Sequence, residues 1–378
     1  MNDKPNILIF IDWFLPGFKA GGPIKSISNI VNTLNKDFNF FIITSDRDID
    51  DEKPYSSVEL NNWIKKDNYQ IAYLTKEKRK AFIIQTLQEQ DFDCYYFNSL
   101  YSIPFTLNPF RFIKKYKSSS KVIIAPRGML GKGALKLKPL KKKIFLTATK
   151  AIGFFNHVSW HATDEEEAKD IKLAFGEKTK IFTTPNISVL NIQKTFISKN
   201  ENELNLVFFS RISPKKNLLF ALEILKHFTN EQISLNIYGS IEDELYWKKC
   251  DDFIKQNNIK TFYKGALYPN EVQSKLSKYH FLFFPTLHEN YGHVIVEALS
   301  AGCGLILSSN TPWKNLQKHK IGWELDLNKK NEFINIIKEC LKMNQEKYNE
   351  YRETCYQFIE KEVSKHNAIE LTKKMLLQ

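Results

Sequence analysis

Two glutamates stand eight positions apart in the sequence HENYGHVIVEALSAG, residues 288–302. Glu289 precedes a turn, and Glu297 lies in an apolar run that predicts a buried helix beginning near Gly292. The first N–H groups of a helix lack intrahelical partners and favour anions, so Asn290, Tyr291, Gly292 and His293 predict a phosphate site. A ligand with two adjacent hydroxyls, such as a ribose, would satisfy the Glu297 carboxylate. A buried ion pair with a lysine is the alternative.

A basic loop, SRISPKKN, supplies a second group of candidates. Arg211 and Lys216 flank this loop, which leads into a predicted helix. A guanidinium fork and an ammonium point charge together suit a diphosphate. Taken alone, a solvated basic turn is the alternative interpretation. Both loops follow predicted parallel strands, and open α/β sheets bind ligands at the carboxyl ends of their strands. The two loops therefore predict one shared diphosphate site.

The elements that must position these residues repeat one pattern along the chain: short apolar runs alternate with amphipathic segments. This pattern predicts doubly wound parallel sheets, and 378 residues favour two domains facing a cleft. We expect an N-terminal Rossmann-like domain over 1–190 and a C-terminal Rossmann-like domain over 200–355, with a linker within 191–205. The predicted strands of the two series cover 7–12, 40–45, 70–74, 94–98, 121–126, 157–162 and 180–185, then 206–210, 235–239, 261–265, 281–285 and 305–309.

The two glutamates in E-NYGHVIV-E, followed by ALSAG and preceded by SRISPKKN, make the chain resemble the retaining glycosyltransferases of family 4. These enzymes have the GT-B architecture, and the resemblance extends to assembly enzymes of O-antigen and capsular polysaccharide. It implies that Arg211 and Lys216 hold the donor diphosphate. It further implies that Glu289 lies beside the donor sugar, Glu297 binds the ribose, and Gly239 and Leu267 lie near the nucleobase.

The N-terminal half resembles a subgroup of the family in which a GGP loop, here Gly21, Gly22 and Pro23, faces the donor phosphates. Arg127 stands near the position where many members have a sugar-binding His, and it is assigned to the acceptor side together with His161. Near His161, Asp164 and Glu167 have the spacing of a helix capping box and are interpreted as structural. Residues 356–378 resemble the helix that crosses back onto the first domain.

The resemblance implies transfer of a hexose from a nucleotide-diphosphate sugar to a glycan or lipid-linked saccharide, in bacterial surface polysaccharide biosynthesis. Arg211, Lys216 and Glu289 would be the catalytic residues, with retention through an oxocarbenium-like transition state. No cofactor and no metal are expected. The triplet Asp46-x-Asp48 in DRDID matches a pattern of metal-dependent transferases, but it is interpreted as solvated surface.

The net charge of +13 favours an anionic partner. The basic, apolar segments 109–117 and 135–143 suggest a peripheral contact with anionic membrane, with a solvated helix face as the alternative. Scattered cysteines and an N-terminal apolar run too short for a span predict a cytoplasmic protein, with the inner face of the cell membrane as a candidate location. Two other functions remain open: a nucleotide-sugar 2-epimerase of the same fold, and a non-enzymatic protein that binds membrane or nucleic acid. No nucleic-acid motif is visible, so no nucleic-acid partner is expected.

Overall fold

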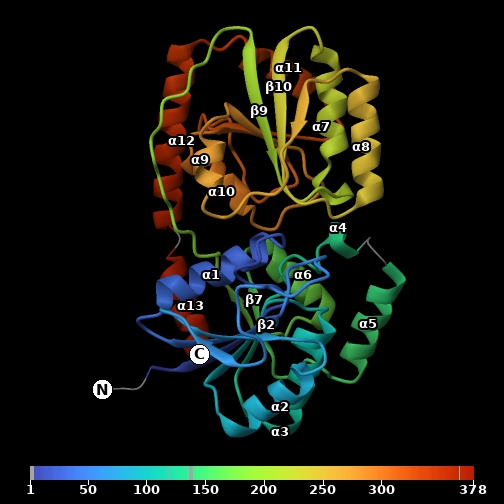
Figure 1. Cartoon of the computed structure of the whole chain (residues 1–378), viewed down its shortest axis with the longest axis vertical. Helices are drawn as coiled ribbons and strands as arrows, with labels where there is room; N and C mark the ends of the chain where they lie inside the picture. The colour runs from blue at the N-terminus through green and yellow to red at the C-terminus, as the bar shows by residue number, and fades with distance from the viewer. Residues whose placement is uncertain (1–3, 118, 136–138, 366) are drawn as a thin grey trace. The chain divides into compact units, whose positions relative to one another are not determined.

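The computed structural model of the chain describes residues 4–117, 119–135, 139–365 and 367–378. It divides into two compact units, Met1–Ile187 with Asn367–Gln378, and Ser188–His366. Each unit is a largely parallel β-sheet covered by helices (Figure 1). The predicted α/β class with two parallel-sheet domains is therefore confirmed.

The first unit is built on an eight-stranded sheet of order β3-β4-β2-β1-β5-β6-β7-β8. All neighbouring strands are parallel except β3, which runs antiparallel to β4. Strand side chains alternate between the two faces, so two separate apolar clusters form, one on each face of the sheet. The strands are β1 (Asn6–Phe10), β2 (Asn39–Ser45), β3 (Trp63–Lys65), β4 (Gln70–Leu74), β5 (Cys94–Phe97), β6 (Val122–Ile124), β7 (Ser159–Ala162) and β8 (Ile181–Thr183).

Helices α1 and α13 lie together in this unit and pack on one another. The helical segments of the first unit are α1 (Gly22–Leu34), α2 (Arg79–Glu89), the π-helix η1 (Ile103–Leu107), α3 (Asn108–Tyr116), α4 (Lys132–Leu135), α5 (Pro139–Ala151), α6 (Glu165–Phe175) and α13 (Ala368–Leu377).

The second unit has a fully parallel six-stranded sheet of order β11-β10-β9-β12-β13-β14. Its strands are β9 (Glu203–Phe209), β10 (Gln232–Tyr238), β11 (Thr261–Tyr263), β12 (Phe281–Phe284), β13 (Gly304–Ser308) and β14 (Gly322–Leu325). Helices α7 (Leu218–Leu225) and α8 (Glu244–Gln256) lie side by side, as Figure 1 shows. The others are α9 (Val272–Leu276), α10 (His293–Ser300), α11 (Lys330–Leu341), α12 (Gln345–Lys365) and the 3₁₀ turns η2 (Pro214–Lys216) and η3 (Lys226–Phe228).

The segment expected as a linker is held against the second unit. Residues 188–202 contain no helix or strand, yet Lys199 is only 2% exposed. Its ammonium donates to the carbonyls of Leu341 and Met343, at the end of α11, and of Asn200. These carbonyls lack helical partners, so a lysine that reaches them caps the helix. The segment is thus a packed strap rather than a free connection.

The chain returns to the first unit later than the resemblance implied. The segment 356–378 was expected to form one crossover helix. In the structure, α12 extends to Lys365 within the second unit, and α13 begins at Ala368 in the first.

Candidate functional site

Two loops meet at the carboxyl edge of the second sheet. One follows β9 and contains the turn η2, and the other follows β12. The Lys215 carbonyl accepts hydrogen bonds from the Leu287 N–H at 2.9 Å and the Thr286 hydroxyl at 3.2 Å. Asn217, left-handed at φ 61°, donates from its side chain to the Pro285 carbonyl at 3.0 Å. Gly and Asn adopt the left-handed backbone conformation at the lowest cost, which explains the asparagine at this turn.

The joined loops bring Lys216 and Glu289 into an ion pair. The ammonium lies 2.6 Å from the carboxylate, and the two side chains are only 12% and 15% exposed. The Lys216 ammonium also lies over the Phe284 ring, 5.3 Å from its centroid. Burial alone would raise the pKa of Glu289, but the charge and hydrogen bond of Lys216 lower it below its ordinary value. Glu289 is therefore ionised at neutral pH.

Lys215 is a cation that the sequence analysis missed. Its side chain is half-buried. Burial, followed by the charge of Lys216, lowers the pKa of Lys215 to about 8, while Glu289 and Glu242 act in the opposite direction. The sequence shows two adjacent lysines, but it does not show that folding would partly desolvate both. The pair makes this edge more positive than one lysine would.

Arg211 follows β9 and forms a partly exposed ion pair with Glu242, at 2.8 Å. The turn after β10 lies beside it, because Ser240 accepts the N–H of Ile212. Gly239 allows this approach: a Cβ there would lie 1.8 Å from the Ser210 carbonyl oxygen. Leu267, predicted near the nucleobase, is partly buried against the core of the same unit.

The predicted helix beginning near Gly292 is confirmed, since α10 starts at His293. Gly292 has φ 78°, and a Cβ there would lie 2.7 Å from Ile295 and 3.2 Å from Glu289. Tyr291 is fixed by Ser188, 2.6 Å from its hydroxyl, and by Trp313, which donates to its carbonyl.

The rest of the predicted phosphate segment lies beside Glu289. The Asn290 N–H donates to the Glu289 carboxylate at 3.2 Å, and the His293 ring packs against Tyr291. Glu297 lies one turn further along α10 and is half-buried. The segment that the sequence assigned to donor binding therefore continues directly from the Lys216–Glu289 pair.

The predicted residues of the first unit gather at the carboxyl edge of its own sheet. Gly21, at φ 67°, precedes α1, and a Cβ on it would contact nothing within 4 Å, so this turn is open. Gly22 is the first residue of α1. The Asn98 side chain, just after β5, donates weakly to the Pro23 carbonyl at 3.4 Å and accepts from Arg127.

Arg127 is held by three neutral groups. Its Nε donates to Asn98 at 2.7 Å, Nη1 to Asn186 at 2.7 Å and Nη2 to the Tyr96 hydroxyl at 2.9 Å. Its backbone is left-handed, at φ 54°. None of the three partners was predicted, because they are far from Arg127 in sequence: two belong to the end of β5, and the third follows β8.

His161 is only 1% exposed and lies behind this arginine. Its Nδ1 is 2.6 Å from the Tyr96 hydroxyl and its Nε2 is 2.8 Å from the Thr184 carbonyl. Burial, followed by the charge of Arg127, lowers the pKa of His161 to about 3. A neutral ring accepts from Tyr96 and donates to Thr184. His161 thus supports Tyr96, in place of the direct acceptor contact that was expected.

The structure also decides the roles of Asp164 and of the acidic triplet in DRDID. The Asp164 side chain accepts from the Glu167 N–H at 2.8 Å, so the structural helix cap is confirmed. Asp46 and Asp48 are 1% and 3% exposed, so the interpretation of DRDID as solvated surface is wrong. The N–H groups of Phe18 and Lys19 donate to the Asp48 carboxylate, which offsets the cost of its burial.

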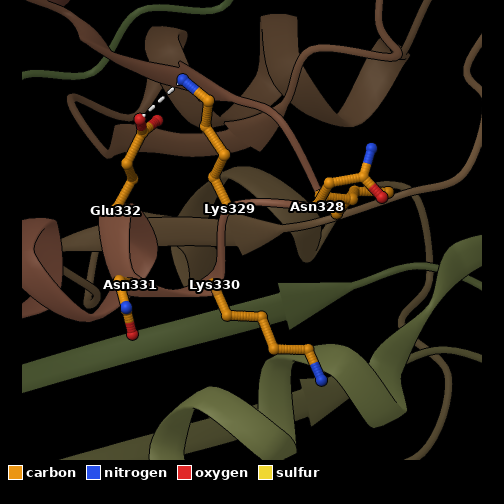
Figure 2. Close-up of a pocket in the computed structure, with 6 residues that line it drawn as sticks. Asn328, Lys329, Lys330, Asn331 and Glu332 are labelled. Atoms are coloured by element: carbon orange, nitrogen blue, oxygen red, sulfur yellow. Dashed lines mark hydrogen bonds and ion pairs between the residues drawn. The ribbon is translucent and has the colours of Figure 1, made fainter.

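A hollow away from these residues lies at the turn before α11, lined by residues 327–332. Figure 2 shows Lys329 and Lys330 pointing in opposite directions; the first pairs with Glu332 and the second with Glu223. It includes none of the predicted site residues. Within the described residues, no three His, Cys, Asp or Glu side chains gather as a metal site. No helix in the described ranges is both long and apolar enough to cross a bilayer.

Comparison with known proteins bears on the family and the fold. Residues 191–358 match the family model described as glycosyl transferases group 1. No curated protein sequence matches the chain. Among solved structures, Anabaena HepE in complex with UDP and glucose matches with a TM-score of 0.68 at 13% identity, over 98% of both chains.

Two further structures cover nearly the whole chain. Sucrose-phosphate synthase from Thermosynechococcus elongatus matches with a TM-score of 0.70 at 12% identity, over 99% of this chain and 97% of its own. TarM from S. aureus matches with a TM-score of 0.69 at 14% identity, over 98% and 99%. The chain has the GT-B fold, as predicted. With the group 1 domain, these findings support a glycosyltransferase of the GT-B type.

Proposed function

We propose that the chain is a retaining, metal-independent glycosyltransferase of family 4, which moves a hexose from a nucleoside diphosphate sugar. The acceptor is a glycan or a lipid-linked saccharide in bacterial surface polysaccharide assembly. The observation that carries the proposal is the buried Lys216–Glu289 pair, which joins the two candidate loops at the carboxyl edge of a parallel sheet.

The arrangement suits departure of a nucleoside diphosphate. Charge develops on the diphosphate as the glycosidic bond breaks, and Arg211, Lys216 and the start of α10 would oppose that charge electrostatically. Ionised Glu289 would hold a sugar hydroxyl and stabilise positive charge on the ring. Glu297 would bind the ribose. Gly239 and Leu267 would lie near the nucleobase.

Some of the similar structures were solved with nucleotide or sugar ligands. HepE was solved with UDP-glucose, and TarM in complex with UDP and alpha-GlcNAc-glycerol. WaaB and WaaG, which also match, are described as a lipopolysaccharide outer core galactosyltransferase and as a glycosyltransferase of lipopolysaccharide biosynthesis. A lipid-linked acceptor would be reached at a membrane surface.

Helix α5 offers a surface for such a contact. Leu140 and Ile144 are 76% and 68% exposed, and Ile152, just after the helix, is 72% exposed. These residues recur every four or eight positions, and Lys141 and Lys143 beside them are also exposed. An exposed apolar stripe flanked by cations suits the surface of an anionic bilayer. Residues 136–138 of the basic segment lie outside the described residues.

Calorimetric titration with UDP, GDP, ADP and TDP, with and without EDTA, tests the donor site. We expect one nucleotide to bind whether or not metal is removed. Lys216→Met should weaken binding and lower turnover, Glu297→Gln should weaken binding, and Lys249→Met, an exposed lysine on α8, should change neither. No binding of any nucleotide by the unaltered protein would refute the proposal.

The reaction itself needs a separate assay. Product formed with a polysaccharide or lipid-linked acceptor should keep the donor's anomeric configuration by NMR. Conversion of the donor sugar to its 2-epimer without any acceptor would contradict transfer and support the epimerase instead.

A further inference from the structure

Arg127 is a half-buried cation that no carboxylate neutralises. Its three hydrogen bonds go to two amide oxygens and a phenol, and within the described ranges no carboxylate lies within ion-pair distance of it. Glu167 bonds the next N–H along, that of Gly128, at 2.6 Å. A charge taken partly out of water is costly unless an opposite charge joins it. A bound anion would offset this cost.

The guanidinium retains unused donors. It has five N–H groups, and the three bonds use one on each nitrogen. In the described part of the chain, one N–H on Nη1 and one on Nη2 make no hydrogen bond. These two lie on the two terminal nitrogens of the guanidinium. Paired donors of this kind suit two oxygens of a phosphate or carboxylate.

The supporting groups fix this fork in place. The Tyr96 hydroxyl accepts from Arg127 and donates to His161, which in turn donates to Thr184. Because the neutral ring of His161 has both nitrogens engaged, this chain of hydrogen bonds runs in one direction only. Asn98 connects the same guanidinium to Pro23 in the first turn of α1. The helix start adds a positive dipole end at the same sheet edge.

We infer that Arg127 binds a phosphate group of a substrate through these two N–H groups. The inference rests on the proposed function in so far as that phosphate belongs to a glycosyl donor or acceptor. Arg127 lies at the sheet edge of the first unit and is assigned to the acceptor side, so a phosphate on the acceptor is the favoured source. The donor diphosphate is the alternative source. A left-handed arginine fits this role, since backbone strain persists where the surroundings fix a functional group.

The test uses the full chain and two titrations. The first measures the affinity for the nucleoside diphosphate that the protein prefers. The second measures inorganic pyrophosphate binding to protein already saturated with that nucleotide, so that the donor site is filled. Each is made on the unaltered protein, on Arg127→Gln, and on Arg111→Gln, an exposed arginine of α3 whose loss changes the net charge equally.

If the phosphate belongs to the acceptor, Arg127→Gln should weaken pyrophosphate binding by about 10- to 100-fold and leave nucleotide affinity unchanged. If it belongs to the donor, the loss should appear in the nucleotide titration. Arg111→Gln should alter neither affinity. Should Arg127→Gln not fold, Arg127→Lys carries the test, because an ammonium keeps the charge but cannot form the fork.

Equal affinities of the unaltered and Arg127 variant proteins in both titrations would overturn the inference. A second pair of results would also overturn it: the nucleotide-saturated protein binds no pyrophosphate, and Arg127→Gln does not change the affinity for the nucleotide. If the unaltered protein binds no nucleotide, the proposed function fails, and pyrophosphate is titrated alone. A loss of its binding in Arg127→Gln would still uphold the anion site.

Discussion

Lys215 and Lys216 are adjacent at one site but differ in their charge partners. Lys216 is neutralised by Glu289 at 2.6 Å, whereas no ion pair of the Lys215 ammonium is found among the described residues. With a pKa of about 8, Lys215 is mostly charged at pH 7 and mostly neutral at pH 9. A bound diphosphate would favour its charged form. Lys215 would thus add attraction that depends on pH.

We expect affinity for the nucleoside diphosphate to fall as pH rises from 7 to 9. A terminal phosphate has a second pKa of about 6, so its own charge changes little across this range. Binding at pH 8.5 should therefore take up a proton onto Lys215. Calorimetry in buffers of different ionisation enthalpy measures this uptake, and Lys215→Met should abolish it. The same pH dependence in that variant would assign the titration to another group.

The contacts between residues far apart in the chain, at the Lys216–Glu289 pair and around Arg127, could not be predicted from the sequence. Lys216 and Glu289 were each identified, but their ion pair spans 73 positions and depends on how two loops dock. Asn217 and Pro285 produce that docking, and no periodicity signals it. Around Arg127, the partners Tyr96 and Asn186 lie at other strand ends, so only the folded sheet brings them together.

At the scale of elements, most strands were predictable, including the three-residue β6, β8 and β11, whereas β3 and β14 were not. FLFFP gave β12 within a residue, since four buried apolar residues follow one another. Strand β3 has three residues and pairs antiparallel at a sheet edge, and β14 reads GWEL. Neither presents an unbroken apolar run or a clear alternation, so both were missed. The linker expected within 191–205 contains the buried Lys199 and enters β9 at Glu203, and its polar sequence signals neither.

The turn after β10 illustrates how an element fixes a site. Gly239 has φ 138°, and its N–H donates to Gly265, whose own φ is 76°. An added Cβ at Gly239 would meet the Ser210 carbonyl at 1.8 Å, whereas at Gly265 it would meet nothing within 4 Å. The two glycines therefore differ in the space around them but share a positive φ that would strain any residue with a Cβ.

We expect Gly239→Ala to lower the free energy of unfolding by more than Gly265→Ala does. The Gly265 variant should lose about 1–2 kcal/mol from backbone strain alone. The Gly239 variant carries the added clash, which moves Ser210 and Arg211 and should also weaken nucleotide binding. Urea denaturation followed by circular dichroism gives both values. Equal losses would mean that the turn relaxes freely and does not position Arg211.

At the scale of the whole molecule, the charge of +13 is accompanied by a specific exposed face. A basic composition alone predicts weak, salt-sensitive attraction to any polyanion. The outer face of α5 adds exposed apolar side chains, with Leu140 and Ile144 one turn apart. Its inner face is occupied, because Phe145 packs on Tyr101 and Phe155. The outer stripe is therefore the part of α5 available to a lipid surface.

We expect the protein to float with vesicles that contain phosphatidylglycerol and to leave them as salt is raised. Each cation near an anionic surface contributes about 1 kcal/mol, and buried apolar side chains add to it. Ile144→Glu places a carboxylate in the apolar stripe and should reduce flotation strongly. Leu245→Glu alters a leucine that is even more exposed, at 83%, on α8 beside acidic residues, and should not. Equal flotation of both variants would reduce the membrane contact to non-specific charge, because the apolar stripe would then contribute nothing.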